Sequence, residues 1–366
     1  MTPEFVSSPI YRETGYRGNH PLAIQRIGSV LTLCEQLGWL PHPGYLDSPA
    51  ATREQLLQFH DAAYLDALIA ADARGKAHPQ ERETYALGTL ENPIFPGLYQ
   101  RAATSVGGSI LAAERAAQRR TVYHPSGGTH HALHNRASGF CFFNDPVFAV
   151  LTLLQQGKQR VLYVDLDAHH GDGVEAAFAG DERVFLISTH EANRWPFTGL
   201  VEDRAGGNAR NLPVPRNLND TEMDRIMAEA VLPLARRFAP DAVVITCGAD
   251  PLLGDPLSSL ELSNTCLWDA VMALVGLVPS AVVLGGGGYN PWTVARCWTG
   301  LWGRIAGLTI PDRLPPASVA YLQSLTSDLV DDEDDMLPWW HETLADPRND
   351  GPVRPEIDTL IRTVLA

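Results

Sequence analysis

Residues 161–173 read V-L-Y-V-D-L-D-A-H-H-G-D-G, and this stretch decides the fold. The apolar, β-branched run from Val161 to Val164 predicts a buried strand. Carboxylates and imidazoles follow it at once: Asp165, Asp167, His169, His170 and Asp172. Such side chains are costly to bury unless they are paired or bind a cation. The stretch therefore predicts a core strand that ends in a polar site.

The spacing of Asp167 and His169 suits a divalent metal. Side chains two apart leave an extended segment on one face, where they offer an oxygen and a nitrogen. Asp250 offers a third ligand. In the alternative interpretation, Asp250 is only a turn residue that precedes Pro251. Three protein ligands leave positions open for water and substrate, as catalytic sites do. Zn²⁺ fits this set, and Fe²⁺ or Co²⁺ would also be accommodated.

Apolar strand-like runs alternate with helical segments along the chain. This alternation predicts an α/β fold with a mainly parallel central sheet flanked by helices on both faces. The expected strands are Thr121–Tyr123, Val161–Val164, Val184–Ile187, Ala242–Thr246 and Ser280–Leu284. The expected helices are Leu98–Gln118, Asp145–Gln156, Thr221–Phe238, Cys266–Val278 and Pro291–Ile305. We expect one domain over residues 1–366, with a loop-like segment at about 328–351 that contains the acidic run Asp328–Asp335.

Polar or glycine-rich segments follow or end each expected strand. They are His124–His131, Asp165–Asp172, Ser188–His190, Cys247–Asp250 and Gly285–Tyr289. In a parallel sheet these segments meet at the carboxyl edge, where open α/β folds bind ligands.

Composition narrows the class of protein. The chain has 366 residues and a formal net charge of −15, which argues against a nucleic-acid partner. Acidity is compatible with a cationic substrate, or it only aids solubility. Five scattered cysteines without a C-x-x-C pair indicate reduced thiols. Without a signal peptide or an apolar run of about 20 residues, we expect a cytoplasmic protein with no membrane partner. The sequence leaves open whether it forms a homo-oligomer.

Two further motifs have competing interpretations. His130 and His131 are core histidines held by backbone carbonyls, or catalytic groups oriented by the spare carboxylates of Asp165 and Asp172. The run Gly285–Gly288 lacks the spacing and the lysine of nucleotide-binding loops. We expect it to let the backbone approach a substrate and to deliver Tyr289, whose hydroxyl can donate to an oxyanion.

Aromatic residues lie beside the predicted site loops. Gly139-Phe140 and Trp195-Pro196-Phe197 are core residues in one interpretation. In the other they wall a narrow channel for a lysine-like chain.

These segments resemble the zinc-dependent histone deacetylase superfamily, which includes acetoin-utilisation proteins and acetylpolyamine amidohydrolases. The resemblance runs from about Tyr16 to Trp302. It rests on H-P-L-A-I-Q-R (20–26), E-N-P-I-F-P-G (91–97), G-F-C-F-F-N-D (139–145), D-L-D-A-H-H-G-D-G (165–173), C-G-A-D-P-L-L-G-D-P-L (247–257) and L-G-G-G-G-Y-N (284–290). It implies the arginase–deacetylase α/β fold.

The resemblance also implies roles for particular residues. The metal ligands would be Asp167, His169 and Asp250. His130 would pair with Asp165, and His131 would pair with Asp172 and act as the general base. Tyr289 would polarise the acetyl carbonyl. Leu257 and Glu91 would lie at the channel mouth. The alternatives are that Leu257 is an ordinary packing residue and that Glu91 is a solvated surface carboxylate.

Members of this superfamily also hold a monovalent cation, usually potassium. Here that implies Asp165, Asp167, His169, Ser188 and Thr189. A second, weaker site would involve Phe178, Asp181 and Val184.

The expected function is metal-dependent removal of an acetyl or other acyl group from a primary amine, with acyl-lysine of proteins favoured. An acetylpolyamine or another small molecule is the alternative substrate. A catalytically silent binding protein and a two-metal arginase-like hydrolase are further alternatives. Many relatives have glycine where this chain has Phe197, so the rim of the channel departs from the family pattern.

Overall fold

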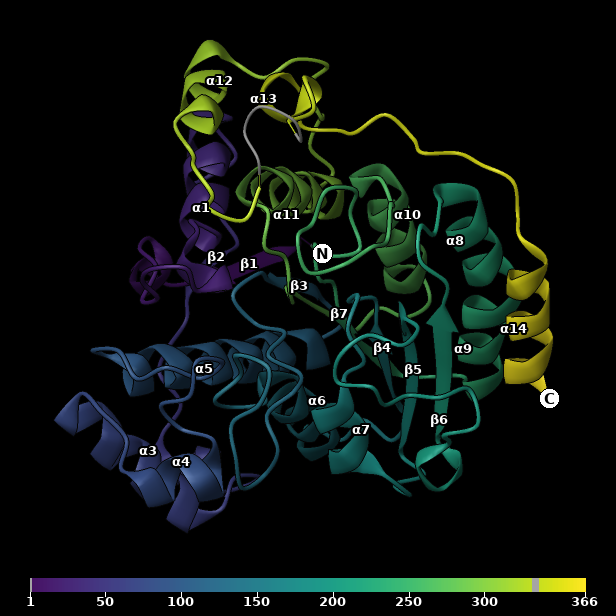
Figure 1. Cartoon of the computed structure of the whole chain (residues 1–366). Coiled ribbons are helices and arrows are strands. Elements are labelled where there is room, and N and C mark those ends of the chain that lie inside the picture. The colour runs from purple at the N-terminus through teal and green to yellow at the C-terminus, as the bar shows by residue number, and fades with distance from the viewer. Residues whose placement is uncertain (1, 331–335) are drawn as a thin grey trace.

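The central feature of the fold is one eight-stranded sheet with the order β2-β1-β3-β8-β7-β4-β5-β6 (Figure 1). The computed structural model describes residues 2–330 and 336–366. Every strand pair within this part of the chain is parallel. The predicted α/β fold with a mainly parallel sheet is confirmed.

All five predicted strands are present, within a few residues of their expected ends. The strands are β1 (Glu4–Ser7), β2 (Tyr45–Asp47), β3 (Thr121–His124), β4 (Val161–Asp165), β5 (Val184–Glu191), β6 (Ala209–Val214), β7 (Ala242–Thr246) and β8 (Ala281–Leu284). The sequence did not predict β1, β2 and β6. Strand β5 runs past its expected end, so Ser188 and Thr189 lie inside the strand rather than after it.

The five predicted helices are also present. The helices are α1 (Ile27–Gln36), α2 (Arg53–Leu56), α3 (Ala62–Arg74), α4 (Pro79–Tyr85), α5 (Leu98–Ala117), α6 (Asp145–Gln155), α7 (Asp172–Phe178), α8 (Asp220–Ile226), α9 (Leu232–Phe238), α10 (Asn264–Val275), α11 (Pro291–Ala306), α12 (Pro316–Gln323), α13 (Trp339–Glu342) and α14 (Pro355–Leu365). The single helix expected over Thr221–Phe238 is α8 and α9 joined by a π-helical turn at Met227–Val231.

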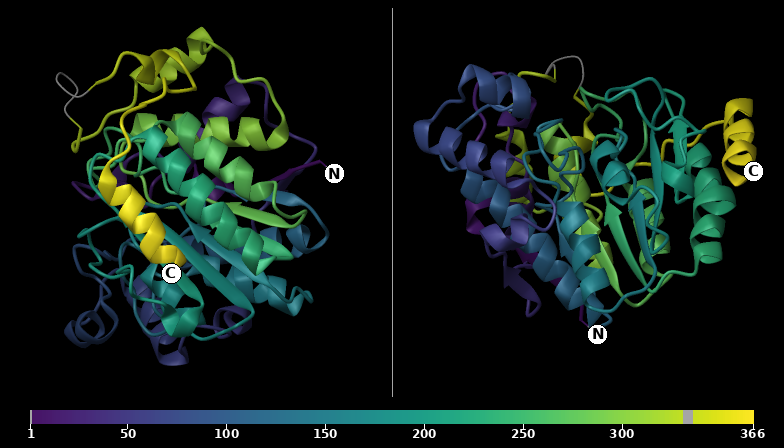
Figure 2. Two further views of the ribbon diagram at one scale, coloured as in Figure 1. Left: turned by 90° about the vertical axis from the view of Figure 1, so that its right-hand side faces the viewer. Right: turned by 90° about the horizontal axis from the view of Figure 1, so that it is seen from below.

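Helices cover both faces of the sheet, as Figure 2 shows. Alternate strand residues point to opposite faces. Leu162 and Val164 of β4 therefore join a core with α1, α8, α9, α10 and α11, while Val161 and Tyr163 join a core with α5, α6 and α7. Strands β4, β7 and β8 are buried on both sides, which explains their apolar sequences.

A smaller third core lies outside α5. It joins α3 to the segment before α6, through Tyr64, Leu68, Phe142 and Phe143 among others. The Tyr64 hydroxyl donates to the Phe142 carbonyl at 2.6 Å. This core holds in place the loop that carries Gly139 and Phe140.

The expected loop at 328–351 is largely irregular, but it contains the short helix α13. The part of its acidic run at 331–335 lies outside the described residues. The chain then ends in α14, which packs beside α8 and β6 (Figure 1). All five cysteines are free and buried. In the described part of the chain, no helix is both long enough and apolar enough to cross a membrane.

Candidate active site

Three ligand-type side chains meet at the carboxyl edge of the sheet. Asp167 and His169 lie in the loop after β4, and Asp250 lies in the loop after β7, the neighbouring strand. One ligand atom from each lies within 4.8 Å of the others. The loop after β4 is bent rather than extended, and both of its side chains still reach the same point. The structure therefore brings together all three predicted metal ligands.

The chemistry of this cluster fits a divalent cation. The carboxylates of Asp167 and Asp250 are fully buried, and among the described residues neither forms an ion pair with lysine or arginine. Burial, and after it the like charge of Asp167, raises the pKa of Asp250 to about 6. Two like charges in a dry site need a compensating cation. Two carboxylates and one imidazole are a donor set suited to zinc.

Glycines are required where the backbone approaches these carboxylates. A Cβ on Gly248 or Gly286 would collide with the Asp167 carboxylate, and one on Gly287 would collide with that of Asp250. The Gly287 N–H donates to Asp167 at 2.6 Å. We expected the Gly285–Gly288 run to approach a substrate. In the structure it packs against the ligand carboxylates, which it orients.

His130 lies behind the ligand cluster. Its Nδ1 is 2.7 Å from Asp165, which also accepts a 2.6 Å hydrogen bond from the Tyr163 hydroxyl. Its Nε2 lies 3.8 Å from Asp167. Burial opposes a charge on His130, but the carboxylates around it outweigh burial and raise its pKa to about 9. His130 therefore holds a positive charge at neutral pH.

His131 lies beside His130, with the ring centroids 3.9 Å apart, and it lines an open cavity. Its Nδ1 is 2.8 Å from Asp172. Burial and the charge of His130 lower the pKa of His131 to about 4, against the opposing effect of Asp172. The imidazole is thus neutral at physiological pH and can accept a proton.

Tyr289 reaches the same cavity from the loop after β8. Its ring lies 6.4 Å from that of His169. Burial raises the pKa of Tyr289 well above its usual value, so the hydroxyl stays protonated and can donate. Asp255, which the sequence did not single out, accepts the Tyr289 N–H at 2.7 Å and fixes its backbone.

The cavity has a volume of about 930 Å³. His131, His169 and Tyr289 form its buried inner end. Trp195 packs edge-on to His131 at 4.6 Å, and Phe140 packs against Tyr289 at 5.8 Å. A side chain at Gly139 would collide with both His131 and Trp195.

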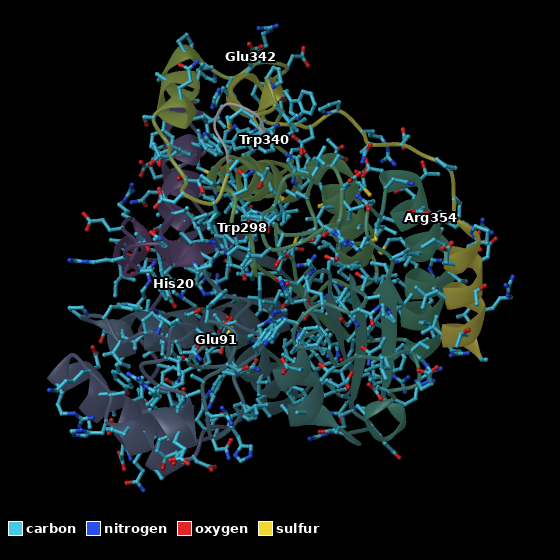
Figure 3. The ribbon with its side chains drawn as sticks, viewed as in Figure 1. His20, Glu91, Trp298, Trp340, Glu342 and Arg354 are labelled. Atoms are coloured by element: carbon cyan, nitrogen blue, oxygen red, sulfur yellow. The ribbon has the colours of Figure 1, made fainter. Side chains whose placement is uncertain are left out.

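The exposed end of the cavity, which we call the mouth, is lined by Glu91, Arg194, Phe197, Arg216 and Leu257, together with the buried Glu191. Every predicted channel residue thus lines the cavity: Phe140, Trp195, Gly139, Leu257 and Glu91. Glu91 also accepts the Gly139 N–H at 2.6 Å, and its carbonyl lies 3.2 Å from His20 (Figure 3).

The sequence did not predict the charged wall of the mouth. Glu191 is buried and pairs with Arg194 at 2.6 Å. Arg194 and Arg216 both donate to the Ser259 hydroxyl, at 2.8 and 3.0 Å. Residues from three separate loops make these contacts, so no local motif marked them.

The residues expected at the first monovalent-cation site also lie together. Asp165 and Ser188 are register partners of β4 and β5. The Ser188 hydroxyl lies 2.8 Å from His190, and the Thr189 hydroxyl donates to the Asp165 carbonyl at 3.4 Å. Potassium at this site stays a prediction.

The residues expected at the second monovalent-cation site have another partner. The carbonyls of Phe178, Asp181 and Val184 all accept from Nδ2 of Asn208, at 2.8, 3.1 and 3.0 Å. The side-chain oxygen Oδ1 of Asn208 accepts the Gly180 N–H at 3.1 Å. An amide of the chain occupies the centre of these oxygens, so they do not fit a cation site.

Comparisons with known proteins agree with this geometry. Residues 20–305 match the family model described as Histone deacetylase domain. The chain is 34% identical over 299 residues to Histone deacetylase 8 of Xenopus tropicalis, with 80% of each chain covered. It is 30% identical over 327 residues to Acetoin utilization protein AcuC of Bacillus subtilis (strain 168), and the match covers 85% of this chain and 84% of that protein.

Solved structures are also similar over the whole chain. The crystal structure of an HDAC homolog from Aquifex aeolicus has a TM-score of 0.95 at 33% identity, with 100% of both chains covered. An HDAC homolog complexed with SAHA has a TM-score of 0.94 at 32% identity. The similarity to the family model includes every loop that contributes to the ligand cluster.

Proposed function

The chain belongs to the histone deacetylase family and is a deacetylase, and from that premise we propose that it hydrolyses the acyl-lysine of proteins. The observation that carries the proposal is the inner end of the cavity. There a neutral histidine and a protonated tyrosine flank a buried Asp-His-Asp cluster. Water attack on an amide needs a base on the water and a donor to the developing oxyanion.

We assign the following roles. Asp167, His169 and Asp250 would hold the metal, which when bound supplies Lewis-acid activation of the water and the acyl carbonyl. His131 accepts the proton of the attacking water, because it is neutral and faces the cavity. Asp172 orients its ring. Tyr289 donates to the oxyanion.

His130 acts from behind as an electrostatic partner. It is buried and charged, and it is not among the residues lining the cavity. Asp165 holds its ring, and Tyr163 holds Asp165. Phe140 and Trp195 sheathe the methylenes of the lysine and exclude water from the reacting end.

The mouth favours acyl-lysine over an acetylpolyamine. Its charged lining residues are Glu91, Glu191, Arg194 and Arg216. Buried Glu191 pairs with Arg194 at 2.6 Å and more loosely with Arg216 at 3.9 Å, and the Arg216 side chain, 73% exposed, is the more accessible charge on that wall. A polyamine tail carries ammonium groups, which the exposed guanidinium of Arg216 disfavours, whereas a peptide backbone carries none.

The test is a comparison of kcat/KM for an acetyl-lysine peptide and for acetylated polyamines, with zinc-replete protein. We expect the peptide to be the better substrate. Arg216→Glu should raise kcat/KM for the polyamine by about 5-fold, because it exchanges a repelling charge for an attracting one. A higher kcat/KM for the acetylpolyamine than for any acyl-lysine peptide would favour the small-molecule alternative.

A further inference from the structure

Phe197 occupies the mouth of the cavity at an energetic disadvantage. Its side chain is 71% exposed, although aromatic side chains are normally buried. Its φ of 63° lies in the left-handed region, which is unfavourable for a bulky residue and open to glycine. Packing does not explain an exposed ring on a strained backbone. Outliers of this kind point to a function at the place where they occur.

The loop holds this ring firmly in position. On one side, the Phe197 N–H donates to the Arg194 carbonyl at 2.8 Å, and Arg194 is fixed by buried Glu191. On the other side, the Thr198 hydroxyl lies 2.8 Å from His170, and the Gly199 carbonyl lies 3.0 Å from His190. The backbone is anchored before and after Phe197, while its own side chain faces the cavity mouth.

We propose that Phe197 is a specificity-determining residue, whose ring selects acyl-lysine substrates with an apolar side chain next to the modified lysine. This inference rests on the proposed function. If Phe140 and Trp195 enclose the lysine chain, the neighbouring residue of the substrate lies at the mouth, between Phe197 and Leu257. Both are apolar, and the ring offers a preorganised face at little cost in side-chain entropy.

The test uses two acetyl-lysine peptides that differ only in the residue after the lysine, leucine in one and glycine in the other. We expect the protein to prefer the leucine peptide. Phe197→Gly should reduce the ratio of the two kcat/KM values by roughly 2- to 10-fold, the range for loss of an aromatic contact. The same variant should keep or raise the Tm, because glycine relieves the strained φ.

Leu200→Ser is the matched control. Leu200 is 58% exposed on the same loop but does not line the cavity, so its variant should keep the substrate preference. An unchanged ratio in Phe197→Gly, or an equal loss in Leu200→Ser, would overturn the inference. A lower Tm in Phe197→Gly would show that the ring is structural.

A binding experiment separates this inference from the proposed function. Two hydroxamates with the same linker, one with a phenyl cap and one with a methyl cap, are titrated into the zinc-loaded protein by calorimetry. Phe197→Gly should weaken only the phenyl-capped compound. That result together with no turnover of either peptide would show that the ring binds apolar groups at the mouth, and it would reject acyl-lysine as the substrate. Equal weakening of both compounds, or of neither, would reject the inference.

Discussion

At the scale of single residues, the two adjacent histidines have opposite environments. His130 is buried behind the ligand cluster with Asp165, whereas His131 faces the cavity with Asp172. In an extended segment the two side chains could not face one way, but in the structure their rings lie side by side, with centroids 3.9 Å apart. Which of them faces the substrate depends on loops from other strands, so the residues alone left this open.

Because only His131 reaches the cavity, the two alanine variants should differ. His131→Ala should lower kcat by at least 100-fold, since it removes the base. His130→Ala should cost less, because it removes an electrostatic partner. Steady-state kinetics with measured metal content checks this. A much larger loss for His130→Ala would reverse the two roles.

Tyr289→Phe tests the oxyanion donor. Removing one such donor typically lowers kcat by about 100- to 1,000-fold. We expect a loss of that size with zinc retained and KM little changed, because the interaction forms in the transition state. Near-normal turnover by this variant would show that another group stabilises the oxyanion.

Other site residues were predictable to different degrees. Asp167 and His169 were visible because a strand and its ligands are continuous in sequence. Asp255 was not, since it acts on the Tyr289 backbone from another loop. Phe197 was visible only as a departure from the family pattern. Its strained, exposed position needed the structure.

At the scale of elements, the sequence predicted the strands that are buried on both faces. Strands β4, β7 and β8 are fully buried apolar runs. Edge strand β6 carries Arg210 and Pro213 and lacks such a run. Strand β1 is only four residues long and begins with the buried Glu4. The carboxylate of Glu4 can be buried because it forms ion pairs with Arg115 and Arg120. These partners lie too far along the chain for a local pattern to show them.

Asn208 links the end of α7 to strands β5 and β6. Asn208→Ala should destabilise the protein by about 2 kcal/mol, because three carbonyls each lose a hydrogen bond from its amide. Converging carbonyl oxygens bind potassium, so KCl should restore the Tm of this variant more than it raises that of the wild type. Thermal melts in KCl and in tetramethylammonium chloride measure the difference. An identical salt response would show that the amide does not take the place of a cation.

The C-terminal helix α14 is tied to the fold by an ion pair with a buried carboxylate. Arg354, at its start, donates to Glu222 of α8 through its backbone at 2.9 Å and its side chain at 2.7 Å (Figure 3). Burial alone would raise the pKa of Glu222, but the hydrogen bonds from Arg354 outweigh it and lower the pKa. The pair therefore stabilises the fold above the unfolded pKa of about 4.3, and this contribution is lost as the pH falls below it.

Glu222→Gln should lower the Tm at pH 7, and the difference from the wild type should shrink below pH 4. Arg225→Gln is the control, because its exposed pair with Asp358 also joins α8 to α14 and should contribute little. Thermal melts across this pH range measure both. A Glu222→Gln deficit that persists unchanged at acid pH would mean that packing, not charge, anchors α14.

At the scale of the whole molecule, the site depends on the parallel arrangement of the sheet. Loops after β3, β4, β7 and β8 meet because these strands are neighbours and end at one edge. One hydrophobic cluster contains residues from Phe5 to Val364, as a single domain would require. That single-domain organisation stays a prediction, as do the oligomeric state and the cytoplasmic location.

The central claim is that Asp167, His169 and Asp250 hold one catalytic metal that supports deacylation. The release of acetate from an acetyl-lysine peptide should be measured in three states of one preparation. The protein is assayed first with zinc bound, then after chelation, and then during titration with Zn²⁺. We predict that chelation abolishes release and that about one equivalent per chain restores it, while Asp250→Ala neither binds zinc nor recovers. Acetate release that persists without metal, or none from the zinc-loaded protein, would contradict the claim.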